Sequence, residues 1–143
     1  MAQNFCLIIH PNTKFCYNGT VSQKGRLTRS FKYAFAGIGS AMKSEPNFRI
    51  HSVIALVVLV AAAVLGFNYL EWLILLLVIY FVLILELINT VLEKIVDLAS
   101  PEINPQAKAA KDISAAAVLF SAVLAIVAGL VLFIPKIWPL IQP

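Results

Sequence analysis

Charged residues are scarce in this 143-residue chain. Only 13% of its residues are Asp, Glu, Lys or Arg, whereas 61% are hydrophobic. Soluble domains average about 25% charged and about 45–50% apolar residues. The apolar residues also gather in long runs, which a soluble core does not need. The composition therefore excludes an ordinary soluble domain and favours a membrane protein.

Cysteine and glycine motifs are equally sparse. Cys6 and Cys16 are the only cysteines, and no second Cys or His pair stands at zinc-ligand spacing. We assign these two residues no role. The chain has no Walker-type glycine-rich loop and no Ser-His-Asp arrangement, so a nucleotide site would have to be built in another way.

Basic residues are present in excess, with 11 Lys and Arg against 7 Asp and Glu. Most of them precede the first long apolar run: Lys14, Lys24, Arg26, Arg29, Lys32, Lys43 and Arg49. Basic residues in such a position hold the cytoplasmic side of a membrane protein and attract anionic headgroups. This distribution argues against a nucleic-acid-binding protein.

The N-terminal part divides into a tail and an amphipathic helix. Residues 1–25 show mixed polarity without a period and predict an irregular tail. Across 27–45, apolar residues recur three or four positions apart among basic ones. That pattern predicts a helix lying in the headgroup region. Residues 26–143 are expected to form one membrane-embedded domain.

Three apolar segments are long enough to cross a bilayer, which takes about 20 residues. We expect transmembrane helices at 48–67, 70–98 and 112–134, separated by turn residues around Gly66 and Pro101. The predicted fold class is thus an all-α membrane protein, with a surface helix and three transmembrane helices in a bundle. Lys94, Lys108 and Lys111 surround the second loop, whereas the first loop carries only Glu71. The positive-inside rule then places the N-terminus and the second loop in the cytoplasm.

The second apolar segment carries a polar stripe. Glu86, Asn89, Thr90, Glu93 and Asp97 recur three or four residues apart and fall within roughly 80° of one helix face. An unpaired carboxylate at membrane depth costs several kcal/mol, so something cationic should neutralise the stripe. A divalent metal, a basic side chain or protons could do so, and each implies another function.

Further ionisable residues fall at the same membrane face. Glu45 precedes the first transmembrane segment, and Lys111 and Asp112 precede the third. Several carboxylates and a lysine at one interface can hold Mg²⁺ and a polyphosphate. The alternative is a purely structural role, in which the polar side chains of the stripe form hydrogen bonds with neighbouring helices. The residues alone thus indicate a metal or proton site at the cytosolic face.

The stripe also lies within a longer motif. Residues 86–97, ELINTVLEKIVD, followed by AKD at 110–112 and AAAVL at 115–119, closely resemble the signature of bacterial diacylglycerol kinases and undecaprenol kinases. The resemblance runs from about Arg26 to Ile134. It implies a homotrimeric lipid kinase of the bacterial cell membrane, with active sites shared between protomers. Such an enzyme transfers the γ-phosphate of MgATP to a lipid hydroxyl at the cytoplasmic face.

The resemblance also implies roles for individual residues. Glu86 matches the catalytic general base, with Asn89 one turn further on, and Glu45 and Glu93 match the acids that hold Mg²⁺. The residues that fall at nucleotide-binding positions are Arg26, Tyr33, Glu45, Glu93, Asp97, Glu102, Lys111 and Asp112. The residues expected near the lipid substrate are Glu86, Phe48, Arg49 and His51.

Three departures from the Gram-negative pattern bear on the substrate. His51 stands where that branch has a Glu, Ala115 replaces a Ser near the lipid, and Ala36 replaces a basic residue. The resemblance therefore favours undecaprenol as the acceptor, with diacylglycerol as the alternative. Two other functional classes remain as alternatives to a kinase: a proton-relay or transporter subunit, and a non-catalytic assembly subunit. The crowding of the acids on one face, rather than in a chain across the bilayer, argues against a relay.

Overall fold

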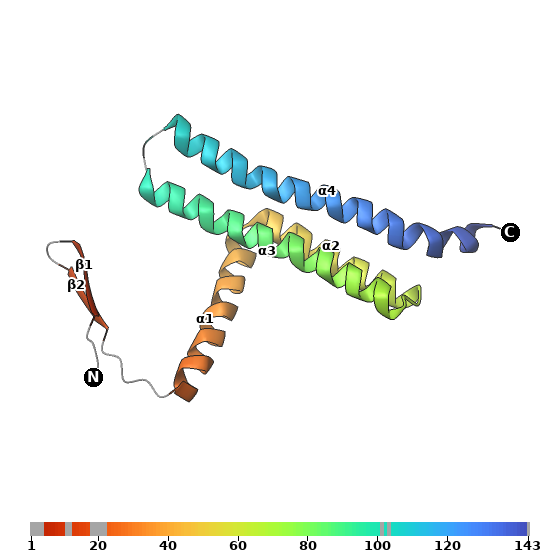
Figure 1. The fold of residues 1–143 in the computed structure, drawn as a ribbon, viewed down its shortest axis with the longest axis horizontal. Helices are drawn as coiled ribbons and strands as arrows, with labels where there is room; N and C mark the ends of the chain where they lie inside the picture. Colours follow the sequence, from red (N-terminus) through yellow and green to blue (C-terminus); the bar gives the residue numbers. More distant parts are fainter. Residues whose placement is uncertain (1–4, 11–12, 18–22, 101, 103, 143) are drawn as a thin grey trace. The chain divides into compact units, whose positions relative to one another are not determined.

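A computed structural model describes residues 5–10, 13–17, 23–100, 102 and 104–142, in the order β1, β2, α1, α2, α3 and α4 (Figure 1). The chain divides into two compact units, Met1–Gly39 and Ser40–Pro143, with the boundary inside α1.

The first unit contains a β-hairpin. Strands β1 (Phe5–His10) and β2 (Thr13–Tyr17) pair antiparallel, with Cys6 opposite Cys16. An irregular tail is expected over 1–25, so this pairing is an addition to the predicted architecture. Both strands are rich in aromatic and β-branched residues, which favour strands, but they are short and the register shifts between Ile8 and His10. Such short strands give little periodicity to detect.

Helix α1 (Gln23–Ser44) begins before the predicted 27–45 and ends at Ser44. Its large apolar side chains, including Leu27, Phe31 and Phe35, are exposed, as a helix in contact with a membrane surface requires. The helix ends because Pro46 disfavours helical backbone at Glu45, which is extended at φ −107° and ψ 109°. Glu45 also makes no side-chain capping bond, so its carboxylate can interact elsewhere.

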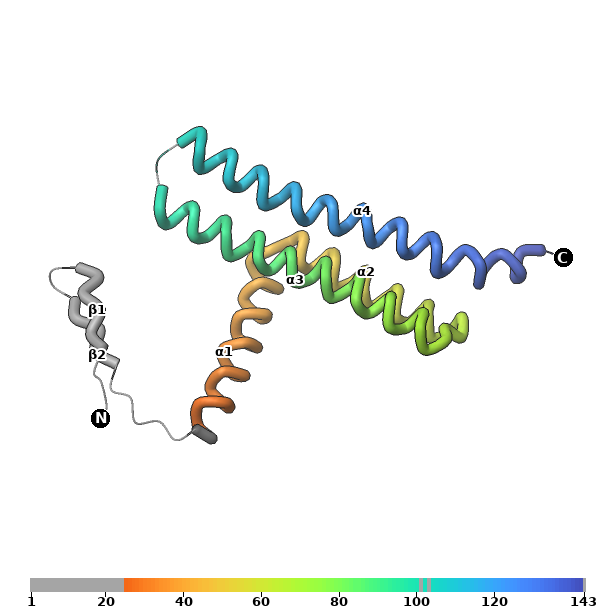
Figure 2. The backbone as a smooth tube through the Cα atoms, viewed as in Figure 1, coloured from red at the N-terminus to blue at the C-terminus, as the bar shows by residue number. Residues whose placement is uncertain are grey.

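The second unit contains the three remaining helices, α2 (Pro46–Val64), α3 (Tyr69–Ala99) and α4 (Pro105–Ile141). Each is long and apolar enough to cross a membrane, which confirms the three predicted spans. The first is shorter than the expected 48–67, and the second is close to 70–98. Helix α3 packs against both α2 and α4 (Figure 2).

Helix α4 departs most from its predicted bounds of 112–134. It starts at Pro105, where Oδ1 of Asn104 accepts the backbone N–H of Gln106 at 2.8 Å. At its other end it continues through Pro135 and Pro139. Apolar membrane helices tolerate proline because neighbouring groups can satisfy the freed carbonyls. The proline that we expected to end the span therefore does not end the helix.

The turn between α2 and α3 anchors the apolar core. Gly66 adopts φ 63°, a conformation that glycine takes without strain. Asn68 and Glu71 form a reciprocal capping box at the start of α3. Phe67 packs on Phe133 of α4 with ring centroids 4.8 Å apart, and Lys136 Nζ lies 3.0 Å from Glu71 Oε2. These contacts hold all three helices together at this end of the bundle.

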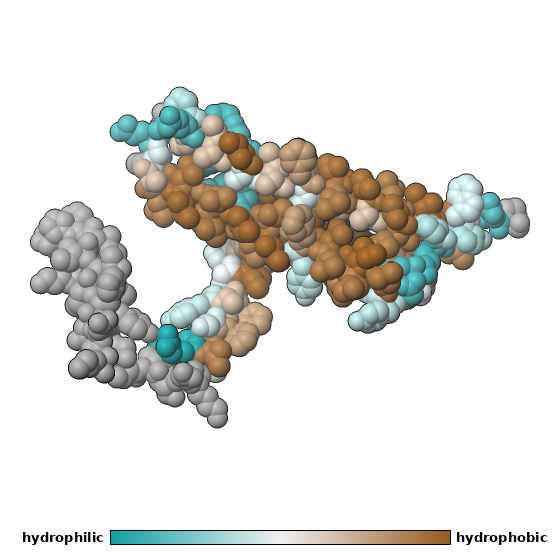
Figure 3. Space-filling view, in the orientation of Figure 1, coloured by the Kyte–Doolittle hydropathy of each residue, from teal (hydrophilic) through white to brown (hydrophobic). Residues whose placement is uncertain are grey.

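The surface of the three-helix unit is largely apolar. In Figure 3 the brown, hydrophobic residues cover the visible face of α2, α3 and α4, while teal residues gather toward the helix ends. Val57, Leu77, Leu119 and Val131 are each more than half exposed, as side chains facing lipid would be. The protein is a membrane protein.

Candidate active site

The polar stripe of α3 changes from buried to exposed along the helix. Glu86, Asn89 and Thr90 have exposed fractions of 2%, 8% and 7%. Glu93 is intermediate, and Asp97 is exposed. The buried part of the stripe is therefore covered by protein rather than facing lipid. Asp97 marks the end of the stripe that solvent can reach.

Glu86 is the least satisfied member of the stripe. Its Oε2 atom is buried and has no hydrogen-bond partner among the described residues. Its backbone carbonyl accepts the Thr90 hydroxyl at 3.0 Å. A buried carboxylate oxygen without a donor is costly. A proton or a substrate hydroxyl at this atom would remove the cost, which makes Glu86 chemically suited to act as a base.

Asn89 joins α3 to α4. Its Nδ2 donates to Oε1 of Glu93 at 2.9 Å, and its Oδ1 accepts the hydroxyl of Ser114 at 2.6 Å. Ser114 is buried, with an exposed fraction of 8%. The sequence prediction does not include Ser114, although a polar residue one helical turn after Lys111 is a signal that could have drawn attention to it.

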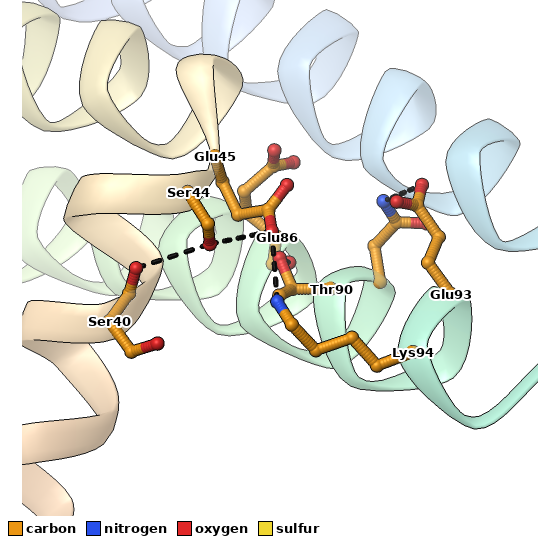
Figure 4. A network of polar contacts seen from close by, with 8 residues as sticks. Ser40, Ser44, Glu45, Glu86, Thr90, Glu93 and Lys94 are labelled. Atoms are coloured by element: carbon orange, nitrogen blue, oxygen red, sulfur yellow. Dashed lines mark hydrogen bonds and ion pairs between the residues drawn. The ribbon is translucent and has the colours of Figure 1, made fainter. Parts of the chain in front are cut away.

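Glu45 has partners on α3 and α1. Lys94 Nζ lies 3.0 Å from Oε1 of Glu45, and the Ser44 hydroxyl donates to the same oxygen at 2.8 Å (Figure 4). The ammonium of Lys94, and then the Ser44 hydroxyl, hold the pKa of the Glu45 carboxyl below its usual range. Glu45 is therefore ionised at neutral pH. The sequence prediction assigns no site role to Lys94 or Ser44.

The two predicted metal-holding acids, Glu45 and Glu93, have different hydrogen-bond partners in this structure. Glu45 is paired with Lys94 and Glu93 with Asn89, and Lys94 and Glu93 are adjacent residues that point about 100° apart on the helix. Among the residues described, no group of three or more His, Cys, Asp or Glu could hold a metal ion. The donor type still fits, because Mg²⁺ in phosphate sites typically takes one or two carboxylates together with phosphate oxygens and water.

Three of the residues predicted to contact the nucleotide, Asp97, Lys111 and Asp112, take part in two ion pairs, and Lys108 is not among the predicted residues. Lys111 pairs with Asp97 across α4 and α3, and Lys108 pairs with Asp112 along α4. The structure therefore brings Asp97 and Lys111 together at the exposed end of the stripe. Glu102 lies exposed in the connection between these helices.

The remaining predicted nucleotide contacts, Arg26 and Tyr33, belong to the part of α1 in the first unit. Both are exposed, Tyr33 by 70%. Their side chains are thus free of the core of that unit. Their role at a nucleotide stays a prediction.

The predicted lipid-contacting residues have different surroundings. Phe48 is buried and Arg49 is exposed, both near the start of α2. His51 lines a groove of about 510 Å³ formed by α2, α3 and α4. The other lining residues are mostly aliphatic, with Val58, Val82 and Ile126 representative of the three helices. His51 is the polar side chain among these lining residues, so the groove has one polar position, and Val82 and Leu83, which also line it, lie about one helical turn before Glu86 on α3.

Known proteins that are similar to this chain are named as lipid kinases. The family model described as prokaryotic diacylglycerol kinase matches residues 32–133. An undecaprenol kinase of Bacillus subtilis is 38% identical over 116 residues, which cover 81% of this chain and 94% of that protein. A diacylglycerol kinase of Synechocystis is 40% identical over 109 residues, covering 76% and 62%. A diacylglycerol kinase of Escherichia coli K12 is 28% identical over 107 residues, covering 75% and 88%.

Proposed function

Because this chain belongs to the prokaryotic diacylglycerol kinase family, we propose that it is a membrane lipid kinase that transfers the γ-phosphate of ATP to the hydroxyl of a membrane lipid. The feature of the site that best supports this function is the carboxylate of Glu86. This buried carboxylate has an oxygen without a partner among the described residues, and on α3 it lies about one helical turn after Val82 and Leu83, which line an apolar groove. A lipid alcohol can occupy the groove with its chain and reach the base with its hydroxyl.

In the proposed reaction, Glu86 accepts the proton of the lipid hydroxyl as the hydroxyl oxygen attacks the γ-phosphorus. A bond forms between this oxygen and phosphorus, and the bond from phosphorus to the β–γ bridging oxygen breaks. ADP leaves with the electron pair of that bond. The proton on Glu86 then passes to solvent or product, which restores the carboxylate. Asn89, one turn further along α3, orients the polar groups of the stripe.

Glu45 and Glu93 are the residues that would hold Mg²⁺, which when bound supplies positive charge to neutralise the polyphosphate. Lys111 and Arg26 can donate hydrogen bonds to phosphate oxygens. The remaining proposed nucleotide contacts are Tyr33, Asp97, Glu102 and Asp112. Asp97 keeps the Lys111 ammonium at the exposed end of the stripe, where a nucleotide from solvent would meet it.

We propose undecaprenol as the preferred lipid and diacylglycerol as the alternative. The relative from Bacillus subtilis is named for undecaprenol, and it is aligned over nearly its full length. The aliphatic lining of the groove and the presence of His51 and Ala115 support an acceptor whose polar part is a single hydroxyl. His51 can donate to one of the two ester carbonyls of diacylglycerol, and the aliphatic lining would leave the other unpaired.

The active assembly is proposed to be a homotrimer with the site at the cytoplasmic face of the cell membrane. Glu45 and Glu93 have separate partners within one protomer, which supports a site that a neighbouring copy completes. Basic residues around the second loop support the cytoplasmic orientation. Mass measurement of the protein in detergent tests the trimer directly.

The activity itself is tested by adding radiolabelled MgATP and a lipid alcohol to the purified protein in mixed micelles. Labelled phosphate should appear in the lipid fraction in proportion to enzyme, time and lipid mole fraction. Absence of label with both undecaprenol and diacylglycerol, from folded protein that binds ATP, would contradict the proposal.

A further inference from the structure

Four groups form a continuous chain of hydrogen bonds from α4 to α3. The single hydrogen of the Ser114 hydroxyl is shared between two acceptors, the Oδ1 atom of Asn89 at 2.6 Å and the carbonyl of Lys111 at 3.0 Å. Asn89 Nδ2 donates to Glu93 at 2.9 Å. One end of this chain is Lys111, a proposed nucleotide contact. The other end is Glu93, which is proposed to hold Mg²⁺. The hydrogen bond between Ser114 and Asn89 is the one that joins the two helices.

We propose that Ser114 is a positioning residue, which fixes the amide of Asn89 and thereby holds the Glu93 carboxylate ready for the divalent cation of the nucleotide. The inference rests on the proposed function. In this role Ser114 does not contact the substrate and does not take part in proton transfer.

The orientation of the Asn89 amide follows from its two neighbours. A carboxylate can only accept hydrogen bonds, so the group of Asn89 that faces Glu93 must be the NH₂. The Oδ1 atom then faces Ser114, and only a hydroxyl hydrogen can satisfy it at 2.6 Å. If the amide were rotated by 180°, two oxygens would face each other at Glu93. The serine hydroxyl thus selects one amide orientation.

Burial makes this selection effective. Asn89 and Ser114 both have exposed fractions of 8%, so water competes poorly for their polar atoms. Removing the hydroxyl would leave Oδ1 of Asn89 without this donor, and a buried unpaired acceptor is costly. The amide would then turn away or recruit water, and Glu93 would lose the donor that fixes one of its oxygens.

The same helix supplies a matched control. Ser121 lies two turns further along α4 and has an exposed fraction of 1%. Its hydroxyl donates to the carbonyl of Val118, three residues back, as the Ser114 hydroxyl does to Lys111. Ser114 in addition reaches α3. Comparison of Ser114→Ala with Ser121→Ala therefore separates the loss of the link to Asn89 from the loss of a buried hydroxyl.

The test measures binding of a non-hydrolysable ATP analogue by calorimetry, as a function of Mg²⁺ concentration, in the full-length protein in micelles. Ser114→Ala should raise the Mg²⁺ concentration for half-maximal binding by about tenfold, the size expected when a buried acceptor loses its donor. Ser121→Ala should leave that concentration unchanged. Ser114→Thr, which keeps a hydroxyl, should recover most of the wild-type value.

If the Ser114→Thr side chain does not fit in this position, a double-mutant cycle of Ser114→Ala with Asn89→Ala still tests the proposal. In the Asn89→Ala background, Ser114→Ala should have little further effect on the Mg²⁺ requirement, because the acceptor is already gone. Full additivity of the two changes would overturn the proposal. So would an unchanged Mg²⁺ requirement in Ser114→Ala, or an equal change in Ser121→Ala.

The binding readout also separates this inference from the proposed function. Wild-type protein that binds the Mg²⁺-nucleotide, with the predicted dependence on Ser114, but phosphorylates no lipid would overturn the lipid kinase and leave the positioning role in place. Wild-type protein that phosphorylates lipid with no dependence of Mg²⁺-nucleotide binding on Ser114 would overturn the positioning role alone.

Discussion

The Nζ atom of Lys94 lies 3.0 Å from Oε1 of Glu45, although the two residues are 49 positions apart in the sequence. This ion pair joins the cytoplasmic half of α3 to the residue that precedes α2, under the proposed orientation. It also places a cation on one of the two carboxylates proposed to hold Mg²⁺. The side chains are 54% and 23% exposed, so the pair contributes roughly 0–1 kcal/mol and a divalent ion can displace it.

Replacement of Lys94 should make Mg²⁺ binding easier. In Lys94→Gln, Glu45 has no competing ammonium, and the Mg²⁺ concentration for half-maximal activity should fall by about two- to fivefold. Lys136→Gln is a matched control, since Lys136 forms a 3.0 Å ion pair with Glu71 at the other end of the bundle. It should leave the Mg²⁺ dependence as in the wild type. A rise in the requirement in Lys94→Gln would show that Lys94 assists the site instead of competing with the metal.

Removal of either proposed metal-holding charge should have the opposite effect. Glu45→Gln and Glu93→Gln each keep nearly the same shape but lose a full negative charge. We expect the Mg²⁺ requirement to rise by about tenfold or more in both, while light scattering should give the same molar mass in detergent as for the wild type. Unchanged Mg²⁺ titrations in both variants would remove these residues from the metal role.

The sequence predicts the elements and the residues of the stripe better than it predicts their partners. Hydropathy locates the three spans, because a bilayer requires long apolar runs, and helical spacing places Glu86, Asn89 and Glu93 on one face. The partners Lys94 and Ser114 are not predicted. Their hydrogen bonds join residues 49 and 25 positions apart, and such pairs depend on how the helices pack.

Helix ends are predicted less well for a related reason. Pro135 and Pro139 are ordinarily expected to end a helix, but α4 continues to Ile141. At its start, the Asn104 side chain caps a helix that begins before the apolar residues do. Local hydrogen bonds therefore extend the helix beyond the part that hydropathy marks.

The orientation in the membrane can be tested by labelling. In a variant with Cys6 and Cys16 replaced by Ser, Tyr69→Cys should react with a membrane-impermeant maleimide from outside the cell. Tyr69 is preferable to its neighbour Asn68, which caps α3, and it is 86% exposed. Ala109→Cys, in the first turns of α4, is the control and should react only after the cells are opened. Labelling of the Tyr69 position from the cytoplasmic side alone would invert the proposed topology.

Lipid preference is expected to favour undecaprenol. Its kcat/KM should exceed that for diacylglycerol when both are compared in one detergent at matched mole fraction, because specificity is a difference in transition-state stabilisation. In the groove, His51 can donate to one of the two ester carbonyls of diacylglycerol, and the aliphatic lining leaves the other without a donor. If diacylglycerol is the better substrate by tenfold, about 1.4 kcal/mol in the barrier, the undecaprenol proposal is wrong and the lipid kinase assignment stands.

The measurement that tests the central claim most directly is the rate of phosphate transfer to lipid in Glu86→Gln, taken together with ATP-analogue binding by the same preparation. The amide has nearly the shape of the carboxylate but cannot accept the proton of the lipid hydroxyl. We expect the transfer rate to fall by at least about 100-fold for undecaprenol and diacylglycerol alike, while Mg²⁺-nucleotide binding stays within about threefold of the wild type. Transfer at close to the wild-type rate in Glu86→Gln would contradict the assignment of this buried carboxylate as the base.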